Sequence, residues 1–122
     1  MNAVNWFEIP SVDYERAVRF YETVYAAELK RDDSFEGMRM AIFPHAETGV
    51  GGCVCYDARQ KPNADGVRIY LNAGDDLAPL LGRVAQAGGE VVMPKTFLAD
   101  EIGHIAMFRD SEGNLIGLHS LH

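Results

Sequence analysis

Two amphipathic patterns, each with the period of an α-helix, divide the chain into halves of similar layout. In the first half, apolar residues follow the spacing of one helical face at Ala17, Phe20, Tyr21 and Val24. The same spacing recurs about 60 residues later, at Leu77, Leu80, Leu81 and Val84. Asp13 precedes the first pattern, and Asp75 or Asp76 precedes the second, as N-cap residues do. This pattern indicates an internal repeat with one helix in each half.

Short runs of apolar, β-branched and aromatic residues surround each helix and predict strands. In the first half these runs cover residues 4–9, 29–32, 38–43 and 49–56. In the second half they cover residues 67–72, 90–93 and the two arms of a hairpin within 103–120, and residues 95–102 are mostly connection. Residues 57–65 contain proline, asparagine and charged residues without periodicity, which indicates a linker.

The resulting order is βαβββ, repeated once. This order predicts an α+β fold in which two modules form a curved mixed sheet around a cleft, with one helix per module on the outer face. We expect a single domain over residues 1–122, with module one at about 1–57, the linker at about 57–65 and module two at about 66–122.

The final hairpin is the most distinctive local sequence. Two strand-forming runs flank the turn Asp110–Asn114, whose residue types favour tight turns. In the second run Ile116 and Leu118 point one way and suit a core, whereas Leu115, Gly117 and His119 point the other way. A gap at a glycine beside an imidazole suits the wall of a pocket. A strand with a bulge glycine and a surface histidine fits the same residues.

Composition and charge exclude several classes of function. The net charge of −7 argues against nucleic acid and anionic membranes as partners. No run approaches the roughly 20 apolar residues of a membrane span, and the N-terminal residues do not have the pattern of a signal peptide. Cys53 and Cys55 are too close along a strand for a good disulfide, so we expect reduced thiols. These features favour a cytoplasmic protein.

The chain resembles the vicinal oxygen chelate superfamily, which includes glyoxalase I, extradiol dioxygenases and bleomycin-resistance proteins. The resemblance covers nearly the whole chain. It rests on the βαβββ repeat and on Trp6–Pro10, Asp13, Arg16–Tyr21, Gly88–Gly89, Asp110–Asn114 and Ile116–His119. It implies the fold more specifically than the activity, because this fold supports unrelated chemistries. It also implies a homodimer, because single-domain relatives complete each cleft with a partner.

The metal-binding members of that superfamily use His, Glu or Gln side chains from the first and last strand of each module. The corresponding positions in this chain are Trp6, Cys55 (or Cys53), Arg68 and Gly117. Neither a tryptophan nor a glycine side chain coordinates a metal, and a guanidinium repels one. The resemblance therefore implies the fold without its usual metal site, and we expect no metal and no other cofactor.

Strand alternation predicts the side chains that line the cleft. They are Trp6, Glu8, Cys53, Cys55, Arg68, Tyr70, Leu115 and His119. Glu8 and His119 are candidate catalytic residues, because a carboxylate can orient an imidazole and raise its pKa for proton transfer. Alternatively, Glu8 forms a structural ion pair with Arg68, or Arg68 binds a carboxylate or phosphate of a ligand.

The two cysteines allow a further alternative. Together with His119 they could hold a soft metal such as Zn²⁺ or Cu⁺, although buried unreactive thiols account for them as well.

Two functions fit these residues best. One is a glyoxalase-like, metal-independent protein that acts on a small carbonyl or oxyacid compound. The alternative is a protein that sequesters a small molecule without catalysis, as bleomycin-resistance proteins do. A purely structural partner of other proteins fits less well, because the polar residues gather on one strand face.

Overall fold

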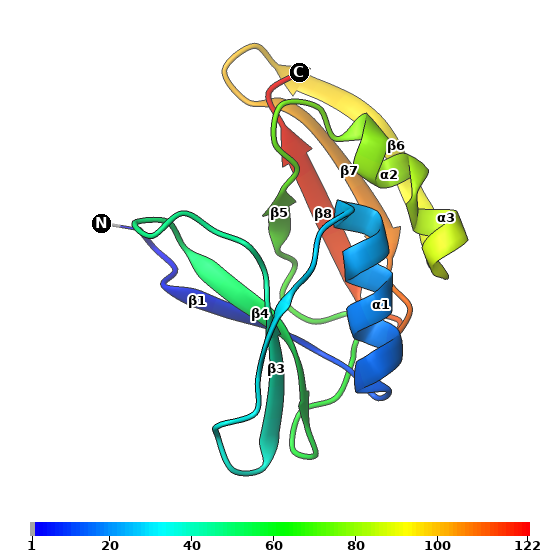
Figure 1. The fold of residues 1–122 in the computed structure, drawn as a ribbon. Helices are drawn as coiled ribbons and strands as arrows, with labels where there is room; N and C mark the ends of the chain where they lie inside the picture. The colour runs from blue at the N-terminus through cyan, green and yellow to red at the C-terminus, as the bar shows by residue number, and fades with distance from the viewer. Residues whose placement is uncertain (1) are drawn as a thin grey trace.

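The computed structural model describes residues 2–122, in which two four-stranded mixed sheets pack with short and long helices (Figure 1). The first sheet has the strand order β1-β4-β3-β2. Its strands are β1 (Trp6–Pro10), β4 (Gly51–Asp57), β3 (Met38–Ile42) and β2 (Lys30–Asp32). The outer strand β1 runs parallel to β4, and the other neighbouring pairs are antiparallel.

The second sheet repeats this arrangement with the strand order β5-β8-β7-β6. Its strands are β5 (Tyr70–Asn72), β8 (Leu115–Ser120), β7 (Gly103–Arg109) and β6 (Glu90–Ala99). The outer strand β5 is again parallel to the last strand of its module. The structure therefore confirms the predicted α+β fold of two modules.

The two modules differ in their helices. Helix α1 (Tyr14–Tyr25) begins as predicted at Asp13, whose carboxylate accepts a hydrogen bond from the backbone N–H of Arg16. The single helix predicted in the second module is instead two short helices, α2 (Ala78–Gly82) and α3 (Val84–Ala87). A proline in the first turn and Gly82 near the break both disfavour a longer regular helix. Within residues 2–122 no helix has the length and apolar character needed to cross a bilayer.

Both sheets turn one face toward the same helix and so share one core. The ring of Tyr21 on α1 lies 5.4 Å from that of Phe43, next to β3, and 6.3 Å from that of Phe108 on β7. Val54 of β4 and Leu118 of β8 are fully buried in this cluster. Figure 1 shows α1 between the first sheet and the end of the second. The other face of each sheet lies outside this core.

Two strands differ from the predicted ranges. β5 begins only at Tyr70, so Arg68 and Val67, which the sequence placed in a strand over residues 67–72, lie outside it, and Val67 is 94% exposed. β6 continues to Ala99, where the sequence predicted a connection. Pro94 obscured this strand, but proline is tolerated on an outer strand, and shifts in the β6–β7 register interrupt the ladder around it.

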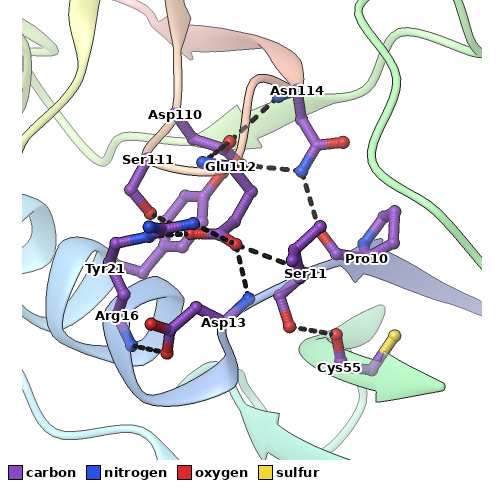
Figure 2. Close-up of polar contacts among 11 residues, drawn as sticks. Pro10, Ser11, Asp13, Arg16, Tyr21, Cys55, Asp110, Ser111, Glu112 and Asn114 are labelled. Atoms are coloured by element: carbon purple, nitrogen blue, oxygen red, sulfur yellow. Dashed lines mark hydrogen bonds and ion pairs between the residues drawn. The ribbon is translucent and has the colours of Figure 1, made fainter. Parts of the chain in front are cut away.

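The turn between β7 and β8 ties the second module to the start of α1 (Figure 2). The side chain of Glu112 is 1% exposed. Its carboxylate accepts hydrogen bonds from the backbone N–H groups of Val12 (2.9 Å) and Asp13 (2.8 Å) and from the guanidinium of Arg16 (2.7 Å). A negative charge is favourable at a helix N-terminus, so this contact both orients and stabilises α1.

The same turn also reaches deeper into the core. The carboxylate of Asp110 accepts a hydrogen bond from the Tyr21 hydroxyl (2.6 Å). The side-chain amide of Asn114 donates to the Pro10 carbonyl (2.9 Å) at the end of β1. A turn predicted only to connect two strands therefore fixes how the two modules meet.

Candidate functional site

Trp6, Glu8, Cys53 and Cys55 lie on the uncovered face of the first sheet. Glu8 is opposite Cys53 in the β1–β4 register, and Trp6 is opposite Gly51. The Trp6 side chain is 40% exposed, whereas both cysteines are fully buried.

Other side chains close off the two thiols. They form a small cluster with the buried Met40, and the Sγ atom of Cys55 lies 3.4 Å from the side-chain oxygen of Gln60 in the linker. The hydrogen bond between the thiols, together with burial, raises the pKa of Cys53. The same hydrogen bond lowers the pKa of Cys55 against the effect of burial. Reactive cysteines are partly exposed thiolates, so this enclosed pair fits a structural role better than a reactive one.

Tyr70, Leu115 and His119 belong to the corresponding face of the second sheet. Tyr70 is opposite Gly117 in the β5–β8 register, and a Cβ atom at Gly117 would overlap the Tyr70 ring. Tyr70 is 45% exposed. Ile116 and Leu118 are buried in the core, which confirms the predicted alternation along this strand.

His119 has a defined partner in the turn between β6 and β7. Its Nε2 atom lies within hydrogen-bond distance of the Ile102 carbonyl oxygen, before β7. A carbonyl oxygen only accepts, so Nε2 carries the proton of this bond, and the neutral ring keeps a lone pair on Nδ1. Nδ1 is therefore the nitrogen of His119 that can accept a proton.

The predicted pairs do not form within one chain. Glu8 and His119 lie on different sheets, on faces outside the common core. Among residues 2–122, neither His119 nor Arg68 forms an ion pair with Glu8.

The residues at the positions where the resemblance implied metal ligands do not fit a divalent metal. A Cβ atom at Gly51 would lie 3.0 Å from the Trp6 ring, so this ring packs over the glycine. The space beside Gly117 is filled by Tyr70 in the same way. Arg68 is exposed and Cys55 is enclosed. Within residues 2–122, no three His, Cys, Asp or Glu side chains of one chain are grouped as metal ligands, so Cys53, Cys55 and His119 do not form such a group.

A cavity of about 630 Å³ opens between the first sheet and β5, and neither Glu8 nor His119 lines it. The aromatic rings of Phe7, Tyr25 and Phe43 line its inner part, and Arg68 and His45 are its basic residues. Arg68 and Tyr70, two of the residues predicted to bind a ligand, line this cavity, whereas Phe7, Tyr25, Phe43 and His45 were not predicted to bind one.

Glycines at the start of β4 help to form this space. Side chains are absent at Gly51 and Gly52, and a Cβ atom at Gly52 would overlap the Phe7 ring. The hydroxyl of Tyr25 donates a hydrogen bond to the Asn72 carbonyl (3.0 Å), which links α1 to β5 behind the cavity. Burial raises the pKa of Tyr25, so this hydroxyl stays protonated. The glycine pair was the available sequence signal for the cavity.

Comparisons with known proteins agree with this architecture. The family model of the Glyoxalase/Bleomycin resistance protein/Dioxygenase superfamily matches residues 3–118. A glyoxalase/bleomycin resistance protein from Streptomyces sp. CB03234 is 26% identical, with a TM-score of 0.70 over 94% of this chain and 97% of that one. No curated protein matches the sequence.

Other solved structures share the fold at lower identity. A glyoxalase I mutant from Zea mays is 21% identical, with a TM-score of 0.70 over 95% of this chain and 45% of that one. A glyoxalase/bleomycin resistance protein from Albidiferax ferrireducens T118 is 15% identical, with a TM-score of 0.68 over 96% of this chain and 97% of that one. Because the family match spans most of its length, the chain belongs to the Glyoxalase/Bleomycin resistance protein/Dioxygenase superfamily.

Proposed function

We propose that this chain acts as a homodimeric, glyoxalase-like protein with a small-molecule site shared between subunits. In each site, the uncovered face of one subunit's first sheet meets the uncovered face of the partner's second sheet. The observation that carries this proposal is the separation of Glu8 and His119 onto two faces outside one core. A two-fold dimer joins such faces twice, since each subunit supplies both halves.

The reaction we propose is proton transfer on a small carbonyl or oxyacid compound, without a metal. His119 accepts a proton through Nδ1 from the carbon next to a carbonyl, while its Nε2–H stays bonded to Ile102. Glu8 of the partner subunit stabilises the imidazolium that forms, and this imidazolium returns the proton to the carbon or to the neighbouring atom. Trp6, Tyr70 and Leu115 supply an apolar wall against the rest of the ligand.

The proposed location is the cytoplasm. Cys53 and Cys55 are free thiols in the structure, and a reducing compartment keeps thiols in this form.

Deuterium exchange tests the reaction directly. The protein is incubated in D₂O with a panel of small α-hydroxy aldehydes, α-hydroxy ketones and α-hydroxy acids, and proton NMR follows the signal of the hydrogen next to the carbonyl. We expect catalysed exchange with at least one compound, and we expect Glu8→Gln and His119→Asn each to reduce it strongly. Exchange that persists in both variants, or no exchange with any compound, would refute the proposed chemistry.

Mixed dimers test the shared site. When Glu8→Gln and His119→Asn chains are unfolded together in equal amounts and refolded, half of the dimers contain one chain of each kind. One of the two shared sites is then intact, so the mixture should regain about a quarter of the wild-type rate. If each site lies within one subunit, the mixture stays as inactive as either parent. Light scattering first establishes the dimer, and a monomeric mass at micromolar concentration would exclude the shared site.

A further inference from the structure

We propose that the cavity between the first sheet and β5 is a second ligand site, which binds a flat apolar carboxylate. This site lies within one chain and does not require a dimer. Its volume of about 630 Å³ falls in the range of small-molecule sites. Neither Glu8 nor His119 lines it, and of the residues of the proposed catalytic site only Tyr70 does.

The shape and chemistry of the walls select the apolar part of the ligand. The rings of Phe7 and Phe43 are 5.8 Å apart and tilted by 39°, and Tyr25 packs on Phe43 with a centroid distance of 5.6 Å. Ile69 and Leu71 of the β5 segment line the cavity with them. Aromatic and aliphatic walls of this kind favour a planar apolar group.

The charges around the cavity select an anion. The chain has a net charge of −7, yet no aspartate or glutamate lines this cavity. Arg68 does, and its guanidinium forms no ion pair with any residue among 2–122. Four other arginines of the described chain are paired with carboxylates, namely Arg16, Arg31, Arg39 and Arg59. Arg68 is therefore available to bind a carboxylate through two parallel hydrogen bonds.

His45 places a second polar group near the same ligand. Its Nδ1 atom lies 2.9 Å from the Ala46 carbonyl oxygen, so Nδ1–H donates this bond. The ring packs over Gly51, since a Cβ atom there would lie 2.8 Å from Nε2. This contact holds the imidazole at the cavity that Arg68 also lines.

Calorimetric titration with 2-naphthoate and its neutral counterpart 2-naphthalenemethanol tests this site. We expect one naphthoate per chain and an affinity roughly tenfold or more above that of the alcohol, because only the acid bonds to the guanidinium. Arg68→Gln should lower the affinity for naphthoate roughly tenfold and leave that for the alcohol unchanged. Chemical-shift changes in two-dimensional NMR should concentrate at residues 43–52 and 67–72.

Two further variants make the result specific. Arg19→Gln is the matched control, because Arg19 is exposed on α1, outside the cavity, and its replacement makes the same change of charge. It should leave naphthoate affinity within about twofold of wild type. Val67→Asp, at a residue that is 94% exposed and lines the cavity, should weaken naphthoate binding by placing a carboxylate beside Arg68.

Three results would overturn the inference: no binding of either compound, equal affinity for both, or the same loss in Arg19→Gln as in Arg68→Gln. None of these measurements depends on deuterium exchange or on a dimer. The second site can therefore fail while the proposed catalytic site stands, and the reverse also holds.

Discussion

Replacing Glu112 by alanine tests whether the hairpin turn of the second module fixes the start of α1. The carboxylate is almost completely buried and bonds to the backbone N–H groups of Val12 and Asp13 as well as to Arg16. Alanine leaves both backbone donors without this acceptor. Each bond to a charged acceptor contributes roughly 1.5–3 kcal/mol. Because Val12 and Asp13 are exposed and water can reach them, we take the lower value for each and expect a loss of about 3 kcal/mol.

Urea unfolding at pH 7, followed by circular dichroism, gives the free energy of unfolding for this comparison. Glu112→Gln keeps one side-chain oxygen, and both backbone N–H groups bond to the same carboxylate oxygen, so both bonds can persist. Because the amide oxygen is a neutral and therefore weaker acceptor, this variant should lose about half as much. Glu101→Ala is the control, because Glu101 is an exposed turn residue with no ion pair to residues 2–122. A loss below about 1 kcal/mol in Glu112→Ala, or one equal to the control, would refute the assigned role of this turn.

Three further predictions concern the same structure. Burial alone would raise the pKa of Glu112, but hydrogen bonds from Arg16 and from backbone N–H groups outweigh it and lower the pKa. The ionised Glu112 therefore stabilises the fold above about pH 4.5, and this stabilisation is lost as the pH falls through the lowered pKa. In Glu112→Gln the free energy of unfolding should depend less on pH, as measured by urea unfolding from pH 7 to 3. Tyr21→Phe removes the buried donor to Asp110 and should lower the unfolding free energy by roughly 1–3 kcal/mol, whereas no change would mean that water replaces the hydroxyl. Gly117→Ala should lower the melting temperature, because the added methyl group overlaps the Tyr70 ring. Adding Tyr70→Ala should recover part of this loss, and additive losses in the double variant would contradict this packing.

Sequence periodicity predicted the elements whose neighbours are local or strongly patterned. The α1 stripe and its Asp13 cap were correct, because a 3.6-residue apolar period that follows a carboxylate is characteristic of a helix and its N-terminus. The alternation in β8 likewise separated buried Ile116 and Leu118 from the residues of the opposite face. A buried face shows in the sequence as a regular spacing of apolar residues, and these correct predictions rest on such spacings.

Predictions failed where tertiary contacts override local preference. The sequence placed a loop around Pro94, but pairing with β7 extends the strand to Ala99. Val67 has strand character, yet β5 pairs with β8 only from Tyr70 onward. Pairing partners come from distant parts of the chain, so no local pattern shows where a ladder starts or stops.

The sequence predicted the strand face of each candidate site residue but not how the two sheets are placed relative to each other. Alternation placed Glu8 and His119 on inward faces of a cleft, and each does lie on the face of its sheet outside the core. It did not reveal that one core holds both sheets against α1. Relative placement of modules depends on contacts such as Asp110 with Tyr21, which are 89 residues apart in sequence.

One arrangement occurs in both modules and bears on the ligand that the uncovered faces accept. In each sheet the first strand places an aromatic ring beside a glycine of the last strand, Trp6 over Gly51 and Tyr70 over Gly117. Trp6 and Gly117 are also the positions where the family resemblance implied metal ligands. The absence of a side chain at each glycine thus leaves room for the ring on the neighbouring strand, and the Trp6 and Tyr70 side chains stay 40–45% exposed. These exposed rings offer a flat apolar surface instead of oxygen or nitrogen atoms that could coordinate a metal. The uncovered faces are therefore suited to stack against a planar part of a ligand.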